Sequence, residues 1–131
     1  DGIYLSVDCY RSIPLKTAAW MMFFIKNQDT IKRYTEYRKT AGLPIAGYEN
    51  FNNVVCLVEL DAERYLYRVI PAGDYNKEGD ELGVSAIISD KKKTFLKGMK
   101  ADWSPIQKGK THESVFALYK FIYGSNESSN R

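Results

Sequence analysis

The sequence is poor in the residues on which most catalytic and metal sites depend. Its 131 residues include one histidine, His112, and two cysteines, Cys9 and Cys56. A zinc site needs four ligands, and a histidine-activated nucleophile would have to use His112. Neither a phosphate-binding glycine loop nor a nucleophile-elbow pattern occurs. We therefore expect no metal and no cofactor, and we favour a binding protein over an enzyme.

Long apolar runs are also missing. The longest, Ala18 to Ile25, has eight residues, whereas a membrane-spanning helix needs ~20. We therefore expect no transmembrane segment. The sequence begins with Asp1 instead of Met, which indicates a processed protein, so we expect it to be secreted or periplasmic.

The two cysteines, Cys9 and Cys56, both fall on apolar faces of predicted strands. In an oxidising compartment they can form a disulfide bond. By closing a long loop of the unfolded chain, it would stabilise the fold by about 4 kcal/mol. We predict this Cys9–Cys56 disulfide. Two separate buried thiols are the alternative, because cysteine also behaves as a small apolar residue.

The composition is that of a folded protein, with 44% hydrophobic and 14% aromatic residues. The length predicts a single domain with one core. We place this globular domain at residues 1–124. The final segment, 125–131, is mostly serine and asparagine and is expected to be a flexible polar tail.

The clearest structural signal is residues 53–70, where two apolar, β-rich runs flank a polar turn. If the turn is tight, Leu60 lies opposite Tyr65, and Glu59 becomes a diagonal neighbour of Arg68. One face of the hairpin then carries only apolar and tyrosine side chains, and this pattern determines which residues face the core. A four-residue loop is the alternative, because the turn lacks an Asn-Gly or Asp-Gly pair.

The remaining segments predict further strands at residues 2–10, 84–89 and 94–97, and helices at residues 17–27, 30–41 and 111–123. Asp29 is the expected N-cap of the second helix, and Gly42 follows its end. Ala18 to Ile25 is apolar on every side, so a strand is the alternative there, and a strand is also the alternative for residues 111–123. Separate groups of strands and helices indicate an α+β fold, an antiparallel sheet of about four to six strands with two or three helices packed on one face.

Charges of opposite sign gather in two parts of the sequence, although the net charge is only +3. The basic part contains Lys91, Lys92, Lys93, Lys97, Lys100 and Trp103. The acidic part contains Asp61, Glu63, Asp74, Glu78, Asp80 and Glu81. We predict that both are binding surfaces, because segregated charge steers protein encounters. Nucleic acid is not the expected partner, since the net charge is small and the basic part lacks arginine.

Residues 74–80 also place oxygen-bearing side chains at alternate positions before Gly79, as the start of a calcium-binding loop does. The twelfth position of such a loop is Ser85 instead of the glutamate that binds the ion with both oxygens. We therefore expect a solvated acidic loop over residues 71–83.

The function that the sequence favours is non-catalytic recognition of another protein. Neutralisation of a partner enzyme by an inhibitor or immunity-type protein is one concrete form. A small hydrolase that uses His112 is one alternative. Another is an apolar-ligand module with a cavity between helices and sheet, lined by Trp20, Phe23, Phe24 and the hairpin tyrosines. The sequence predicts no oligomeric state.

Overall fold

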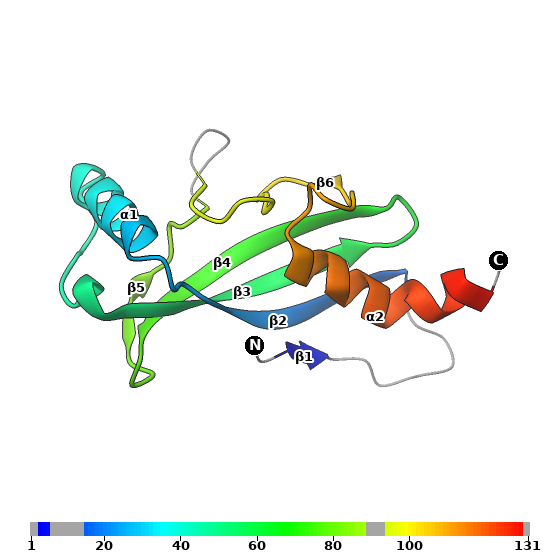
Figure 1. Ribbon diagram of the computed structural model, residues 1–131, viewed down its shortest axis with the longest axis horizontal. Coiled ribbons are helices and arrows are strands. Elements are labelled where there is room, and N and C mark those ends of the chain that lie inside the picture. The colour runs from blue at the N-terminus through cyan, green and yellow to red at the C-terminus, as the bar shows by residue number, and fades with distance from the viewer. Residues whose placement is uncertain (1–2, 6–14, 89–93, 130–131) are drawn as a thin grey trace.

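The computed structural model describes residues 3–5, 15–88 and 94–129. Its centre is an antiparallel sheet in the order β1-β2-β3-β4-β5, with the short β6 also paired to β4 (Figure 1). The strands are β1 (Ile3–Leu5), β2 (Lys16–Phe24), β3 (Phe51–Asp61), β4 (Leu66–Asn76), β5 (Glu81–Val84) and β6 (Ser104–Pro105). The helices are α1 (Gln28–Thr40), the single-turn 3₁₀ helix η1 (Tyr48–Asn50) and α2 (Glu113–Ser129). The predicted α+β fold with an antiparallel sheet is thereby confirmed.

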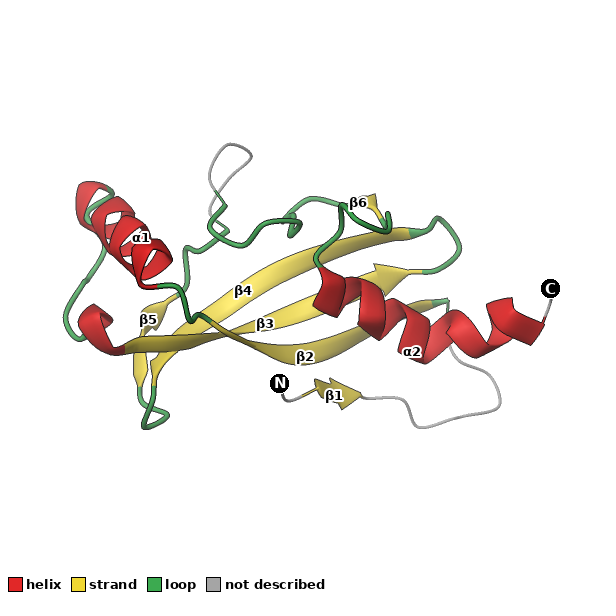
Figure 2. Ribbon diagram, in the orientation of Figure 1, coloured by secondary structure: helices red, strands yellow, loops and turns green. Residues whose placement is uncertain are grey.

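Both long helices pack against one face of the sheet, which we call the core face (Figure 2). Side chains alternate along each strand, so that Phe23, Val58 and Val69 of three neighbouring strands are buried on this face. Tyr34 of α1 and Leu118 of α2 are fully buried in the same core cluster. The connection between β5 and α2 completes the core beside β4, where it forms backbone hydrogen bonds to the strand edge.

Residues 16–24 form strand β2, so the helix predicted over residues 17–27 is wrong and the strand alternative is right. β2 lies between β1 and β3 and pairs with β3 along its whole length. Phe23 is 6% exposed, whereas Trp20 and Phe24 are 45% and 43% exposed on the opposite face. Pairing on both edges has overridden the helix preference of Ala and Met. Because both faces of β2 carry apolar side chains, the segment lacks the alternation of polar and apolar residues that would have indicated a strand.

The hairpin predicted over residues 53–70 is present, with a four-residue loop instead of a tight turn. Leu60 lies opposite Tyr67, and Glu59 lies directly opposite Arg68, so the pairing is shifted by two residues from the tight-turn register. A shift of two keeps every strand side chain on its predicted face. Tyr65 is the exception, because it lies in the loop with a φ of 61°.

Helix α1 confirms the helix predicted over residues 30–41 and begins two residues earlier. Its N-cap is Asn27 instead of Asp29, because the Asn27 side-chain oxygen accepts hydrogen bonds from the first free backbone N–H groups. Gly42 follows the helix with a φ of 77°, and its N–H donates to the Lys39 carbonyl. Glycine adopts this left-handed conformation without strain.

Helix α2 confirms the predicted closing helix but continues past the expected end at Gly124 to Ser129. The division into a domain of residues 1–124 and a flexible tail stays a prediction.

Of the predicted strand 2–10, the structure describes the three residues of β1, and residues 6–14 lie outside the described chain.

The loop predicted over residues 71–83 is wrong, because β4 continues to Asn76 and β5 starts at Glu81. Pro71 misled the prediction, since proline cannot donate a hydrogen bond within a sheet. It lies where the pairing of β3 and β4 shifts register, and such a bulge accommodates the missing donor. Within the predicted hairpin of residues 84–89 and 94–97, the described part contains one bridge, between Ile88 and Thr94.

Candidate functional site

The exposed acidic residues of the predicted binding surface lie at opposite ends of β4. Glu63 is exposed in the β3–β4 loop, whereas Glu78, Asp80 and Glu81 are exposed at the β4–β5 turn. Figure 2 shows these two turns at opposite ends of the sheet. β4 has eleven residues, which separates the turns by on the order of 30 Å. These acids therefore do not form one patch.

Asp61 and Asp74, which the sequence places on the acidic surface, are buried. Asp61 accepts a hydrogen bond from the backbone N–H of Arg64 and so stabilises the β3–β4 loop. Asp74 lies on the core face of β4, directly opposite Val54. A buried carboxylate cannot meet a partner's surface, so these two residues are corrections to the predicted set.

The basic residues are divided by the limits of the described chain. Lys91, Lys92 and Lys93 lie outside the described residues, whereas Lys97 and Lys100 are exposed. The Lys100 carbonyl accepts a hydrogen bond from the N–H of Val69, which places Lys100 beside the half of β4 that adjoins the Glu63 loop. The described lysines and acids are therefore not segregated to opposite ends of the molecule.

Asp74 is the centre of a buried polar cluster that joins α1 to the sheet. Its Oδ2 accepts hydrogen bonds from the hydroxyls of Tyr34, at 2.5 Å, and Tyr48, at 2.8 Å. The Arg38 guanidinium lies 3.5 Å from the same oxygen and stacks on the Tyr48 ring. Arg38 also donates to the carbonyls of Pro44 and Val84, so most of its buried donors are used.

Burial of the carboxyl group has the largest effect on the pKa of Asp74 and raises it. Hydrogen bonds from Tyr34, Ser85 and Tyr48 and the positive charge of Arg38 act to lower this pKa. Burial together with the Asp74 charge raises the pKa of Tyr34 to about 12, and the pKa of Tyr48 is also raised. Oδ1 of Asp74 has no hydrogen-bond partner among the described residues. Because Arg38 and Asp74 are both inaccessible to solvent, we assign the cluster a structural role.

His112 is the N-cap of α2 and lies immediately before the helix instead of in its first turn. Its Nδ1 accepts a hydrogen bond from the N–H of Ser114, and its ring packs edge-on against Phe23. Burial lowers the pKa of His112, although nearby Glu113 acts to raise it. A small hollow of about 200 Å³ beside it contains Lys26 and Ser114, but no carboxylate and no cysteine among its described lining residues. The ring is therefore used as a helix cap, and the geometry gives no support to a hydrolase.

The face of the sheet opposite the core is mostly apolar, and its described residues include several exposed side chains; we call it the open face. The strand register arranges its central residues in four rows across the sheet: Ala18, Glu59 and Arg68; Trp20, Leu57 and Ile70; Met22, Val55, Gly73 and Val84; Phe24, Asn53, Tyr75 and Glu81. Trp20, Phe24, Ile70 and Val84 are its large exposed apolar side chains. The residues that the ligand-cavity alternative groups together lie on both faces, with Phe23 in the core, so one cavity cannot contain them all.

Trp103 joins the rim of the open face from the connection between β5 and α2. Its ring covers the guanidinium of Arg68 at 4.7 Å, and Arg68 Nε donates to the Glu59 carboxylate at 2.5 Å. This arrangement pairs the two charges of the first row with each other. Both tryptophans of the sequence, Trp20 and Trp103, thus belong to the open face or its rim.

At the opposite end of the open face is a hollow of about 310 Å³, which we call the amide hollow. Its lining residues are Met22, Phe24, Asn52, Asn53, Val55, Tyr75, Asn76, Lys77 and Gly79. Apolar and aromatic side chains alternate there with three amides, and Lys77 is the one charged residue of this lining. Such a mixture binds an apolar group that carries a polar end.

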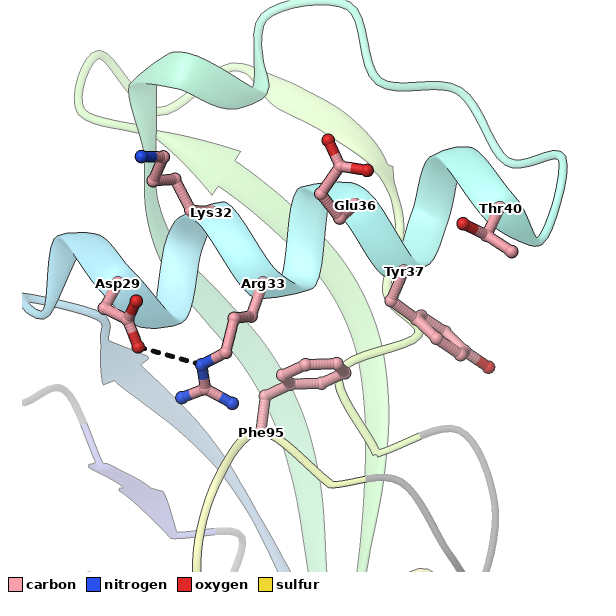
Figure 3. A pocket seen from close by; sticks show the side chains of 7 residues that line it. All are labelled: Asp29, Lys32, Arg33, Glu36, Tyr37, Thr40 and Phe95. Atoms are coloured by element: carbon pink, nitrogen blue, oxygen red, sulfur yellow. Dashed lines mark hydrogen bonds and ion pairs between the residues drawn. The ribbon is translucent and has the colours of Figure 1, made fainter.

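A larger groove of about 690 Å³ lies along α1, where all described lining residues except Phe95 belong to the helix (Figure 3). Arg33 is bonded to Asp29 at 2.9 Å and lies over the Phe95 ring. Lys32 and Glu36 add one further charge of each sign. Because its acids and bases balance, this groove selects neither anions nor cations, and we assign it no ligand.

Three further predictions concern the disulfide bond, metal binding and membrane-spanning segments. Cys56 is a free, fully buried thiol, but Cys9 lies outside the described residues, so the disulfide stays a prediction. Within the described chain, no three histidine, cysteine or acidic side chains meet as a metal site requires. None of the described helices has the length and apolar character to cross a bilayer.

Comparisons of the chain with protein families, with characterised proteins and with solved structures find no match. The candidate site therefore depends on the geometry described above. Sequence reasoning missed the open face because it assigned residues 17–27 to a helix. The signal was present, since Trp20 and Phe24 are apolar residues at the outward positions of an alternating strand.

Proposed function

We propose that this protein is a non-catalytic domain that recognises a partner protein through the open face. One observation carries the proposal: β2 buries Phe23 in the core and leaves Trp20 and Phe24 nearly half exposed on the other face. Neighbouring strands add Ile70 and Val84 to the same surface. Contiguous exposed apolar residues mark interaction surfaces, and aromatic residues contribute most of the binding energy at protein interfaces.

The open face also indicates the chemistry of the partner. The two middle rows of the face contain no charged residue, and Glu59 and Arg68 in the first row are paired with each other, so the centre of the face offers a partner few free charges. A complementary partner surface is apolar and largely uncharged, and the free energy of its binding comes from removing apolar area from water. We therefore expect binding to depend little on salt, unlike recognition through the charged segments.

Location and biological role are part of the same proposal. Secretion or export to a periplasm, and inhibition of a partner enzyme, fit a small protein-binding domain. The open face gives such an inhibitor a rigid docking surface, because strands hold side chains more precisely than loops do.

Site-specific photo-crosslinking in cells that make the protein tests the proposal. A benzophenone amino acid replaces Trp20 or Ile70 on the open face, and Phe121 on α2 as the matched control, since Phe121 is also an exposed apolar residue. We expect one discrete protein adduct at positions 20 and 70 that is absent at position 121. The purified adduct partner must then bind the wild-type domain in solution. Equal adducts at all three positions, or no binding by the purified partner, would contradict the proposal.

A further inference from the structure

The groove along α1 opens on the side of the helix that faces away from the core. The buried residues of α1 are Ile31, Tyr34 and Arg38. The residues of α1 that line the groove recur at spacings of three and four along the opposite side of the helix. They are Asp29, Lys32, Arg33, Glu36, Tyr37 and Thr40, and Phe95 lies beside them (Figure 3). α1 therefore presents an outward face about 20 Å long.

The charges on this face balance, but two of them are unpaired among the described residues. Asp29 and Arg33 are bonded at 2.9 Å through Nε of Arg33. Lys32 and Glu36 are exposed and four residues apart, yet no ion pair joins either of them to a residue that the structure describes. Lysine before glutamate is the less favourable order for a pair within one helix. One cation and one anion are thus available to another molecule.

The order of these charges matches a reversed copy of the same helix. Along α1 the signs are negative at Asp29, positive at Lys32 and Arg33, and negative at Glu36. A second copy of α1 can lie antiparallel across this face, with the two-fold axis at the midpoint of the groove residues. Glu36 of one copy then lies level with Arg33 of the other and one residue from Lys32. Two cations face each Glu36, and the symmetry repeats the contact. A parallel copy in register would instead place like charges together.

The remaining groove residues are complementary in the same alignment. Asp29 lies level with Thr40 of the second copy, whose hydroxyl can donate to a carboxylate. Lys32 lies level with Tyr37 of the second copy, and an aromatic ring attracts a cation to its face. The antiparallel order also places the positive N-terminal end of each helix beside the negative C-terminal end of the other. A surface with this balance of acids and bases therefore fits its own copy.

We infer that the groove along α1 is a self-association surface, occupied by α1 of a second copy of this chain in the antiparallel alignment. Each copy contributes one helix of thirteen residues, which is a small contact, so the dimer forms in the micromolar range. α1 packs on the core face, so both open faces stay uncovered. The inference goes beyond the proposed function, because the dimer presents two open faces and thereby strengthens binding to a partner with repeated sites.

Sedimentation velocity of the wild type at increasing concentration tests the inference. We expect a reversible shift from monomer to dimer. High salt should weaken the dimer, because the paired charges are exposed and salt screens them. This salt dependence distinguishes self-association through α1 from contacts between the apolar open faces.

Two charge variants identify the surface. Lys32→Glu/Arg33→Glu and Glu36→Lys each place like charges together in the dimer, so each variant alone should dimerise at least about tenfold more weakly than the wild type. An equimolar mixture of the two should recover dimerisation, because opposite charges then meet at every one of these contacts. Circular dichroism shows that each variant is folded, and recovery in the mixture shows that both α1 surfaces are intact.

Two further variants serve as controls. Lys108→Glu changes the net charge at an exposed position on the connection before α2, and Trp20→Ala alters the open face. Both should dimerise as the wild type does.

The inference would be overturned by a wild type that stays monomeric at about 1 mM. Wild-type dimerisation by Glu36→Lys, folded charge variants that fail to associate when mixed, or loss of the dimer in Trp20→Ala would also overturn it. Partner recognition through the open face is tested by photo-crosslinking and does not depend on these outcomes.

Discussion

The guanidinium carbon of Arg68 lies 4.7 Å from the ring centre of Trp103. This contact fixes Trp103, which follows β5 by nineteen residues, at the rim of the open face. Arg68 is held in turn by the Glu59 carboxylate on the neighbouring strand. At an exposed site such stacking contributes about 0.5–1 kcal/mol. The rim is thus ordered before any partner arrives, which lowers the entropy cost of binding.

The adjacent residues Phe23 and Phe24 lie on opposite faces of the sheet, so their variants should differ in stability. We expect Phe23→Ala to lower the free energy of unfolding by about 3–5 kcal/mol, because it leaves a cavity in the core. Phe24→Ala, on the open face, should cost no more than about 1 kcal/mol. Urea unfolding followed by circular dichroism measures both. Similar losses for the two variants would contradict the assignment of residues 16–24 to a strand with one buried face.

The buried cluster around Asp74 makes a second prediction. Tyr48→Phe removes one of the two hydroxyl bonds to Oδ2 of Asp74 and should lower the free energy of unfolding by about 1.5–3 kcal/mol, the range for bonds to charged groups. Tyr65→Phe is the matched control, because Tyr65 is exposed, and it should have almost no effect. The same urea experiment compares them; equal effects would show that the cluster does not stabilise the fold.

His112 predicts a dependence of stability on pH. Burial lowers the pKa of His112 in the folded protein, so the unfolded chain binds a proton first as the pH falls. The stabilisation is therefore complete above about pH 6.5, the pKa of an unperturbed histidine, and decreases at lower pH. His112→Asn keeps a helix cap but does not titrate. Between pH 7.5 and 5.5, the wild type should lose stability relative to this variant; parallel curves would refute the prediction.

The burial of Cys56 predicts that its thiol reacts slowly in the folded protein. Burial, aided by the charge of Asp74, raises the pKa of the Cys56 thiol to about 12, and the thiolate is the reactive form. In protein whose cysteines have been reduced, a disulfide reagent such as Ellman's reagent should therefore label Cys56 only after the protein unfolds. Peptide mapping after native labelling provides the measurement. Rapid labelling of Cys56 in the folded protein would show that the core opens there.

The predicted disulfide has its own test. Labelling in denaturant without reducing agent counts the free thiols of Cys9 and Cys56. Because we predict that the two cysteines are paired, we expect no free thiol. Two free thiols would rule out the disulfide and remove one argument for an oxidising compartment.

The parts of the fold that the sequence predicts correctly are those with one apolar face. Ile31, Tyr34 and Arg38 share the buried face of α1, as their spacing predicts. β3 and β4 keep their predicted faces despite the altered turn, because strand periodicity survives a two-residue shift. The prediction fails at β2, where Trp20 and Phe24 make the outer face apolar too. The segment that misled secondary-structure reasoning is therefore the one that carries the candidate site.

The site itself could not be predicted from residue order, for a related reason. Segregated charges suggested two surfaces, but pairing along β4 separates the acids and buries Asp74. The amide hollow combines Phe24, Asn53 and Tyr75, which are far apart in the sequence and meet only through strand register. Register between distant strands depends on the whole sheet, so local patterns do not reveal such a row.

The affinity of the purified crosslinked partner for open-face variants tests the central claim most directly. Isothermal titration calorimetry at low and high salt compares the wild type with Trp20→Ala and with Phe121→Ala as the control on α2. The open-face account predicts at least tenfold weaker binding for Trp20→Ala, unchanged binding for Phe121→Ala and little effect of salt. Wild-type affinity in Trp20→Ala, with a loss of binding at high salt, would contradict it.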